Sequence, residues 1–281
     1  MDAFWIILTG SLVALNGALL GSFLLLRRMS LVGDAISHAA LPGIVVAYLF
    51  TTSLTSPFLL VGAALTGLAT TWIIETLNQK ARLQHDAAIG LTFTLLFAIG
   101  VILVSTFTGQ IDLDMDCVLY GEIAYVPLDT ITLASGLDMG PKQVWTLGSV
   151  FVGLFILMLT GYRGLSLTTF DAGYAAALGF NTSFWHYALM GAVSLSTVAA
   201  FESVGAILVV AFLVGPAATA FLLTRSLKWM LLIASAAGIA SAVSGYYLAL
   251  WLNGSISGAM ALMTGVIFTG AFIWQMVSKQ Q

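Results

Sequence analysis

The sequence predicts an all-α integral membrane protein with eight to nine transmembrane helices, of which nine fit the charges best. Hydrophobic residues make up 60% of the 281 positions and charged residues only 7%, whereas soluble domains carry about 25% charged residues. The apolar segments reach roughly 20 residues, which is the length of a membrane-spanning helix and exceeds the roughly 10 residues of a barrel strand. We therefore expect one transmembrane domain over residues 1–281.

Nine apolar segments qualify as spans. The first, 4–26, has no basic residues before it and no small-residue cleavage site after it, so we expect it to be retained and not removed as a signal peptide. The segments 35–50 and 185–200 fall short of the roughly 20 residues of a full span. The stretch 185–223 is too long for one span, and we divide it at Phe201–Gly205, "FESVG". The other spans are 57–77, 87–107, 144–162, 204–222, 229–252 and 256–277.

The basic residues orient the chain. With the N-terminus outside, nine alternating spans put the loops 27–33, 78–86, 163–184 and 223–228 and the C-terminal tail in the cytoplasm. Of the nine lysines and arginines, only Lys142 then lies outside. Those inside are Arg27, Arg28, Lys80, Arg82, Arg163, Arg225, Lys228 and Lys279. Because cytoplasmic loops are enriched in Lys and Arg, the sequence predicts an N-out, C-in topology.

The stretch "GDAISHAALPG" places ionisable residues inside an apolar segment. Gly33 is expected to break the preceding helix, and Asp34 to cap or open the next one. Asp34 and His38 are four residues apart, so on a helix they share one face about 6 Å apart. Pro42 lacks an N–H, which frees the carbonyl of His38. The alternative is that Asp34 only caps a helix and His38 only packs.

A carboxylate with an imidazole suits Zn, Mn or Fe(II) better than calcium or Cu(I). Ionisable residues within a span are functional candidates by default. We therefore predict that Asp34 and His38 are metal ligands on a transport path. Two side chains do not complete a site, but a symmetric dimer meeting at this helix would supply four.

The sequence does not decide the role of several other polar residues. The external connection 108–143 holds six acidic residues and one lysine, so it either attracts cations or a basic partner, or is simply a polar loop. Glu202 is placed at the external turn, and His85 and His186 lie near cytoplasmic ends, where His186 fits an interfacial anchor better than a ligand. The single cysteine, Cys117, excludes an intramolecular disulfide and a cysteine-based zinc site.

Three blocks of the sequence carry a family resemblance. "LLLRRMSLVGDAISHAALPGI" resembles the signature of permease subunits of bacterial ABC importers for zinc, manganese and iron. The block 170–223, with "AALGFN" and "VGAILVVAFLVGPAATA", is similar to the second half of the same family, and "DCVLYGEIAYV" resembles its stretch after the fourth span. The resemblance covers nearly the whole chain.

The resemblance implies an assembly in the inner (cytoplasmic) membrane of a bacterium. Its partners would be a second permease subunit, identical or paralogous, two cytoplasmic ABC ATPase subunits and an extracytoplasmic metal-binding protein. The implied fold is similar to that of the cobalamin and siderophore importer permeases without their first span, which agrees with an external N-terminus. Besides membrane lipid, the implied ligand is the transported Mn²⁺, Zn²⁺ or Fe²⁺; we expect no resident cofactor and no nucleic acid.

The resemblance also implies roles for single residues. Asp34 and His38 match the aspartate and histidine taken as the family's metal-handling pair. The segment 216–228 would be the coupling segment for the ATPase, with the loop 171–181 as a second contact. Its candidate residues are Pro216, Ala217, Ala218, Arg225 and Lys228. Glu202 stands where relatives often have a neutral or basic residue, and the acidic loop looks longer than in many members.

Motif searches narrow the functional class. The chain has no Walker A loop, so we expect it not to be an enzyme and to depend on a separate ATPase. The alternative, an ion-gradient-driven secondary metal transporter, should show related halves with charges in corresponding places, and the second half has no counterpart to Asp34 and His38. An intramembrane hydrolase would need an HExxH or serine motif that is missing. We therefore expect a permease of an ATP-driven divalent-metal importer.

Overall fold

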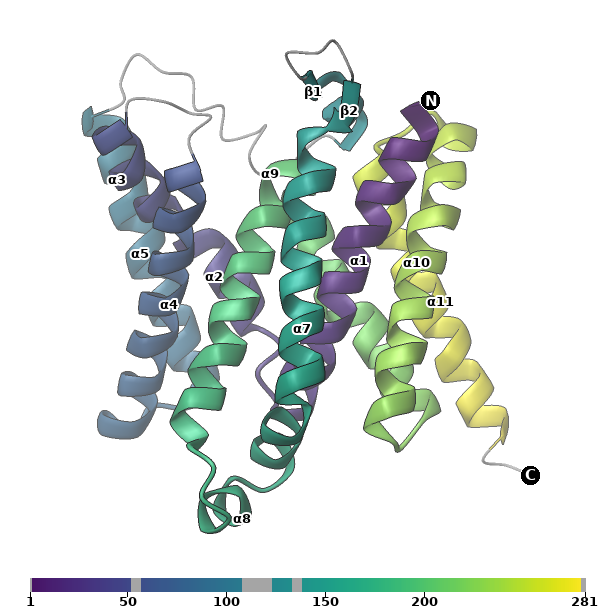
Figure 1. Ribbon diagram of the computed structural model, residues 1–281. Helices are drawn as coiled ribbons and strands as arrows, with labels where there is room; N and C mark the ends of the chain where they lie inside the picture. The colour runs from purple at the N-terminus through teal and green to yellow at the C-terminus, as the bar shows by residue number, and fades with distance from the viewer. Residues whose placement is uncertain (1, 52–56, 108–122, 133–137, 279–281) are drawn as a thin grey trace. The chain divides into compact units, whose positions relative to one another are not determined.

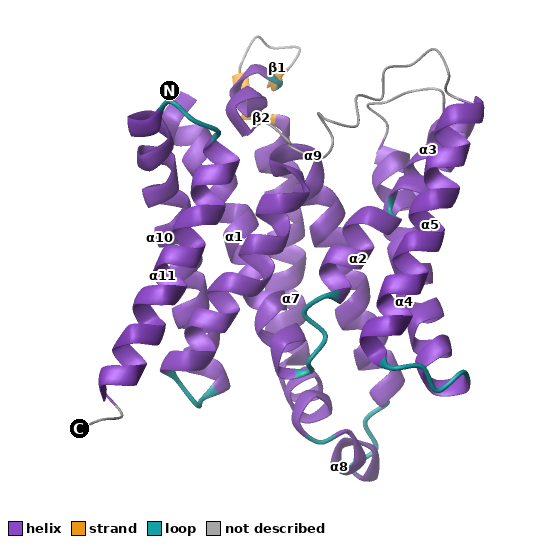
Figure 2. Cartoon of the chain, turned by 180° about the vertical axis from the view of Figure 1, so that it is seen from behind, coloured by secondary structure: helices purple, strands orange, loops and turns teal. Residues whose placement is uncertain are grey.

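The computed structural model describes residues 2–51, 57–107, 123–132 and 138–278. Over these residues the chain is almost entirely helical (Figures 1 and 2). Nine of the described helical stretches are long and apolar enough to cross a membrane, which confirms the predicted number of spans. The helices are α1 Asp2–Leu26, α2 Val32–Ala39, α3 Leu41–Thr51, α4 Pro57–Lys80, α5 His85–Phe107, α7 Lys142–Phe170, α8 Ala172–Ala177, α9 Thr182–Leu223, α10 Leu227–Leu252 and α11 Ile256–Ser278.

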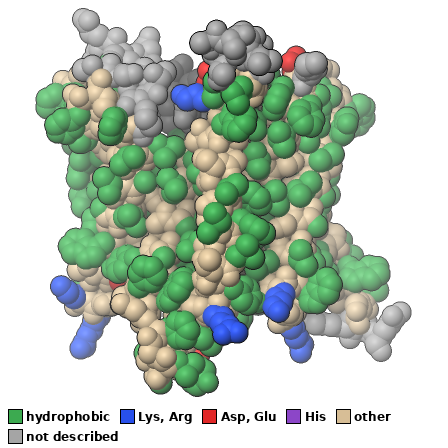
Figure 3. Space-filling view, in the orientation of Figure 1, with side chains coloured by type: hydrophobic (Ala, Val, Ile, Leu, Met, Phe, Trp, Pro, Cys, Tyr) green, Lys and Arg blue, Asp and Glu red, His purple; other side chains and the backbone are tan. Residues whose placement is uncertain are grey.

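The helices group into two compact units, each assembled from separate stretches of the chain. Unit 1 comprises Met1–Arg28, Met115–Leu159 and Ala200–Gln281, and unit 2 comprises Met29–Asp114 and Thr160–Ala199. Both α7 and α9 contribute one part to each unit. Hydrophobic side chains line the helices and Lys and Arg side chains lie towards their ends (Figure 3), as expected for helices in a bilayer.

The predicted spans match the helices, with three instructive differences. The short segment 35–50 is one span made of α2 and α3, which together run from Val32 to Thr51. The span predicted at 144–162 is part of α7, which continues eight residues further to Phe170. The prediction ended the span at the next charged residue, but a helix can continue beyond the bilayer after such a residue. The divided stretch 185–223 is the single helical run α9, interrupted at Gly205, whose φ of 77° and ψ of 167° are not helical. The side chain of Glu202 lies outside the described residues.

Unit 1 packs through close helix approaches at small residues. At Gly21 of α1 a Cβ would overlap the carbonyl oxygen of Leu213, and at Gly17 a Cβ would lie 2.8 Å from that of Phe212. In membranes, where lipid is as apolar as leucine, such small residues let backbones approach and gain van der Waals contact. Ser22 of α1 bonds within its own helix, donating to the carbonyl of Ala18 at 2.7 Å.

The connection before α7 is partly structured. It holds the 3₁₀-helix η1 Ile123–Leu128 and a short antiparallel pair of strands, β1 Thr130–Thr132 and β2 Asp138–Pro141. Gly140 has a positive φ of 84° and faces the ring of Trp5, leaving no room for a Cβ. The sequence analysis predicted no strands in this connection, because strands this short leave no alternating pattern. Its acidic residues Asp112, Asp114, Asp116 and Glu122 lie outside the described residues.

Unit 2 is organised around α4. A Cβ on Gly43 of α3 would overlap the carbonyl oxygen of Gly62, and one on Gly67 would lie 3.0 Å from Ile36 of α2. Ile36 thus lies beside Gly67, and Gly43, further along the chain, lies beside the earlier residue Gly62. The α2–α3 stretch and α4 therefore run antiparallel. Ala40, Ala63 and Val198 are buried together between α2–α3, α4 and α9.

Candidate functional site

The candidate metal ligands lie on α2, the short helix that follows α1. The chain leaves α1 through Arg28, whose φ of 59° is left-handed, and α2 begins at Val32. The prediction that Gly33 breaks a helix is therefore wrong, because Gly33 lies inside α2. Asp34 sits in the first turn without capping it, because α2 has no side-chain capping hydrogen bond. In that turn its negative charge interacts favourably with the helix dipole.

Asp34 and His38 form a pair on one face of α2, as their spacing predicted. Nε2 of His38 lies 3.5 Å from Oδ1 of Asp34. Two ligand atoms that are each about 2.1 Å from one ion lie about 3.4 Å apart at a tetrahedral angle. The side chains are 25% exposed for His38 and 46% for Asp34. Both donors thus fit one ion and remain accessible in the single chain.

Two phenylalanines of α5 hold the imidazole. The ring of His38 lies 5.6 Å from that of Phe93, tilted by 47°, and 6.1 Å from that of Phe97, edge-on at 85°. Phe93 and Phe97 lie eight and twelve residues after His85, the first residue of α5, which has 23 residues. His38 therefore lies level with the middle of α5, far from either end of that helix.

The helical stretch that carries Asp34 and His38 is interrupted just before Pro42. Regular α-helix ends at Ala39 and resumes at Leu41, in the turn that precedes the N–H missing from Pro42. Ala40 between them keeps a helical φ of −70° and ψ of −23°, so the interruption is confined to one residue. Pro42 itself is buried, and its ring and Leu41 face Gly100 of α5.

The structure corrects part of the predicted coupling segment. Pro216 and Ala217 lie inside α9 and are buried, so they offer no surface to a partner protein. Ala218 lies in the same helix, half-buried. The connection between α9 and α10 is only three residues long, and it brings Arg225 and Lys228 to its exposed side. Of the five candidates, these two remain available for docking.

The loop 163–184 contains a helix that the sequence analysis missed. Asp171 caps α8 by accepting a hydrogen bond from the backbone N–H of Tyr174 at 2.9 Å. Gly179, with a φ of 84°, follows the helix, and Asn181 then accepts from the N–H of Phe184 to cap α9. Asp, Gly and Asn are the residues that helix ends prefer, so this signal was present in the sequence. Tyr174 on α8 is exposed.

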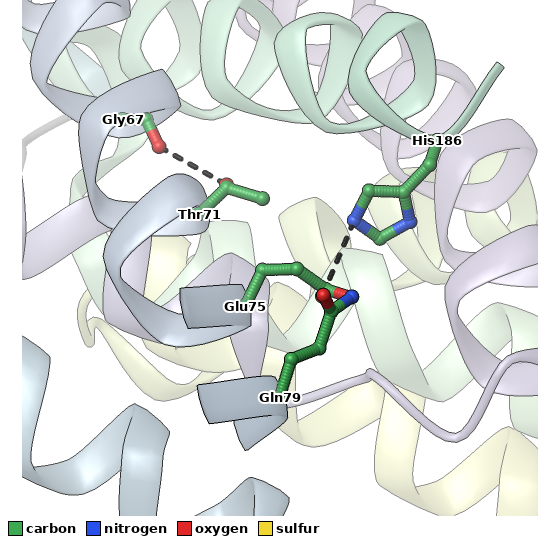
Figure 4. Close-up of polar contacts among 5 residues, drawn as sticks. All are labelled: Gly67, Thr71, Glu75, Gln79 and His186. Atoms are coloured by element: carbon green, nitrogen blue, oxygen red, sulfur yellow. Dashed lines mark hydrogen bonds and ion pairs between the residues drawn. The ribbon is translucent and has the colours of Figure 1, made fainter. Parts of the chain in front are cut away.

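A second carboxylate–imidazole pair was also missed. Nε2 of His186 lies 3.6 Å from Oε2 of Glu75 (Figure 4). Glu75 and Gln79 are one turn apart on α4, and the Gln79 amide donates to the Glu75 carboxylate. The sequence feature that could have identified this site is a polar stripe on one helix face, formed at four-residue spacing by Thr71, Glu75 and Gln79. His186 is thus paired and is not only an interfacial anchor.

The remaining charged groups do not extend the Asp34–His38 pair. Across the described ranges, no group of three or more His, Cys, Asp and Glu side chains gathers around one point. Burial lowers the pKa of Arg27, the first residue after α1, although an arginine remains protonated at any physiological pH. Among the described residues, Asp34 and His38 are thus a pair of candidate ligands without a third His, Cys, Asp or Glu beside them.

Nine described helical stretches long enough to cross a membrane, one of which carries an ionisable pair, are typical of a multi-pass membrane transport protein. The chain belongs to the ABC 3 transport family, whose model matches residues 3–275. It is accordingly a membrane permease subunit of an ATP-binding-cassette importer.

Two relatives illustrate the family. The chain is 50% identical over 270 residues to the manganese transport system membrane protein MntD of Bacillus subtilis (strain 168), covering 96% of this chain and 91% of the relative. It is 42% identical over 269 residues to the zinc transport system membrane protein TroD of Treponema pallidum (strain Nichols), covering 96% of this chain and 73% of the relative.

Solved structures agree with the fold. The chain superposes with a TM-score of 0.78 on PsaBC from Streptococcus pneumoniae in complex with Fab, at 30% identity over 95% of this chain and 90% of that one. An inward-facing putative metal-chelate type ABC transporter gives a TM-score of 0.68 at 19% identity, over 98% of this chain and 85% of that one. The second likeness concerns the fold alone, and it fits the predicted similarity to chelate importers.

Proposed function

We propose that this chain moves a divalent transition-metal ion, Mn²⁺ or Zn²⁺ and by the same chemistry Fe²⁺, into the bacterial cytoplasm. The observation that carries the proposal is the Asp34–His38 pair, with donors 3.5 Å apart and with His38 level with the middle of α5. A carboxylate and an imidazole suit these ions. The names of the relatives, which include manganese and zinc transport proteins, support the same substrates.

Asp34 and His38 form a transient binding site for the ion. Two protein ligands leave most of the coordination sphere to water or to a second permease subunit, whose own Asp34 and His38 would bring the total to four. A site used for passage must bind weakly enough to release. The phenylalanines beside His38 keep the imidazole oriented without adding ligands, so the ion is recognised and then released.

Energy comes from separate ATPase subunits in this proposal, since the chain has no Walker A loop of its own. Each unit supplies its own docking surface on the cytoplasmic side: the capped helix α8 in unit 2, and the short connection with Arg225 and Lys228 in unit 1. An extracytoplasmic binding protein delivers the ion on the opposite side of the inner membrane. Closure of the ATPase pair pushes on the docking surface and opens the path inward.

Reconstitution tests the proposal against the secondary-transporter alternative. The permease and its partner ATPase are placed in proteoliposomes, and ⁵⁴Mn²⁺ transport is measured with ATP on the ATPase side, with and without imposed proton or sodium gradients. We expect transport that requires ATP and is lost when the Walker A lysine of the ATPase is replaced. Transport by the permease alone, driven by a gradient, would overturn the proposal.

A further inference from the structure

Glu75 and His186 face each other from two helices of unit 2. Nε2 of His186 on α9 lies 3.6 Å from Oε2 of Glu75 on α4, and the two side chains are 20% and 27% exposed, respectively. Figure 4 shows Thr71, Glu75 and Gln79 stacked along one face of α4, with the imidazole directed at the Glu75 carboxylate. The arrangement repeats the donor types and nearly the separation of the Asp34–His38 pair.

Helix α4 packs tightly against α9. Ser194 donates from Oγ to the carbonyl of Ala64 at 3.1 Å, and Gly67 leaves the space that the Ser194 side chain fills. Thr71 donates to the carbonyl of Gly67 at 3.1 Å (Figure 4). The contact between Ser194 and Gly67 lies eight residues along each helix from Glu75 and His186, about 12 Å of helix rise, and it holds together the two helices that carry the pair.

The second pair lies on the cytoplasmic side of the first. Ile36, which stands between Asp34 and His38 in α2, is level with Gly67 of α4. Glu75 is eight residues further along α4, which is about 12 Å of helix rise. It is also five residues before Lys80, the last residue of α4, and therefore about 7.5 Å from the cytoplasmic end of that helix.

We propose that Glu75 and His186 form a second transient site for a divalent transition-metal ion, which the ion occupies after leaving Asp34 and His38. This inference rests on the proposed function. Mn²⁺, Zn²⁺ and Fe²⁺ all accept a carboxylate with an imidazole, and passage through several weak sites permits both entry and release. A carboxylate and a histidine inside apolar spans are costly to keep for packing alone.

A neighbouring side chain can add to the ligand set. Gln79 presents its amide to the Glu75 carboxylate, and a half-turn of that amide would direct its carbonyl oxygen to the same ion. Oxygen donors of this kind favour Mn²⁺ over softer ions.

Counting bound ions tests the inference. The permease, assembled with its ATPase in nanodiscs, is titrated with Mn²⁺, and free Mn²⁺ is followed by electron paramagnetic resonance. We expect the unsubstituted protein to bind one Mn²⁺ per permease chain at Glu75 and His186, in addition to the ion held by Asp34 and His38, which two permease subunits share when both supply ligands. The double variant Glu75→Gln with His186→Gln should bind one ion fewer per chain, and Asp34→Asn with His38→Gln should lose only the ion of that pair. Asp86→Asn, the same charge change at the start of α5, is the matched control and should keep the ions of both sites.

Each outcome decides a different claim. Unchanged Mn²⁺ stoichiometry in the Glu75/His186 variant overturns the second site, even if uptake falls, because the pair would then act only in packing. If that variant loses one ion while the Asp34/His38 variant loses none, the second site stands and the Asp34–His38 assignment fails. Co-purification with the ATPase confirms that each variant is assembled, and the single variants Glu75→Gln and His186→Gln serve where the double variant does not assemble.

Discussion

The ring of His38 meets the ring of Phe97 edge-on, with centroids 6.1 Å apart and planes 85° apart. His38 belongs to α2 and Phe97 to α5, so this contact fixes the imidazole against a neighbouring helix while its Nε2 stays beside Asp34. The orientation of the imidazole nitrogen beside Asp34 thus depends on a residue of another helix.

Phe97→Leu should therefore weaken Mn²⁺ binding without removing a ligand. An aromatic pair contributes about 0.5–1.5 kcal/mol beyond its buried area, which corresponds to a roughly two- to tenfold weaker affinity. Titration of the purified complex with Mn²⁺ measures the change. Phe155→Leu, which removes the stacked pair of Phe151 and Phe155 in α7, is the control and should leave the affinity unchanged. Equal affinities for Phe97→Leu and the unsubstituted protein would argue against the positioning role.

Gly21→Ala should destabilise the protein. A Cβ at this position would overlap the carbonyl oxygen of Leu213, so α1 and α9 would have to separate. Overpacking of this kind costs about 1–3 kcal/mol. The melting temperature in detergent is the measurement. Gly153→Ala, where nothing lies within 4 Å of the added Cβ, is the matched control and should melt at or above the unsubstituted temperature, because alanine favours helix. Similar melting of both variants would contradict the close approach.

Asp171→Ala should weaken coupling to the ATPase. The substitution removes the cap of α8, in which the carboxylate accepts from the N–H of Tyr174, and capping residues contribute about 1 kcal/mol. Stimulation of ATP hydrolysis by the permease is measured in nanodiscs, where we expect a clear reduction. Asp171→Asn keeps an accepting oxygen and should retain most of the stimulation. A loss in Asp171→Asn as large as that in Asp171→Ala would point to the charge and not to the cap.

Arg225→Gln and Lys228→Gln test the second part of the docking surface. Both residues lie at the three-residue connection between α9 and α10, and removing either charge should reduce ATPase stimulation while Mn²⁺ binding persists. The effect should shrink at high salt, because exposed charges are screened. Unchanged stimulation in both variants would leave α8 as the docking element and remove 225–228 from it.

Much of the fold was predictable because a bilayer imposes simple rules. Span length and the positions of the basic residues predicted nine spans and their orientation. The division of 185–223 at Phe201–Gly205 includes the glycine at which α9 leaves helical geometry. The i, i+4 spacing placed Asp34 and His38 on one face. These are properties of single helices, which local sequence determines.

Contacts between helices were not predictable in the same way. Glu75 and His186 are more than a hundred residues apart, and no local pattern pairs them. The helix start at Val32 and the extension of α7 to Phe170 also escaped prediction, because helix ends are set by backbone hydrogen bonds and neighbours more than by hydropathy. For the same reason Pro216 and Ala217 were assigned to a docking segment although they are buried.

The central claim is that Asp34 and His38 handle the transported ion, and ⁵⁴Mn²⁺ uptake by bacteria producing the complete importer tests it most directly. Asp34→Asn and His38→Gln, made singly, are compared with Asp86→Asn, and assembly with the ATPase is measured for each. We expect both Asp34 and His38 variants to lose uptake while they remain assembled, and Asp86→Asn to transport normally. Normal uptake by both single variants would contradict the assignment.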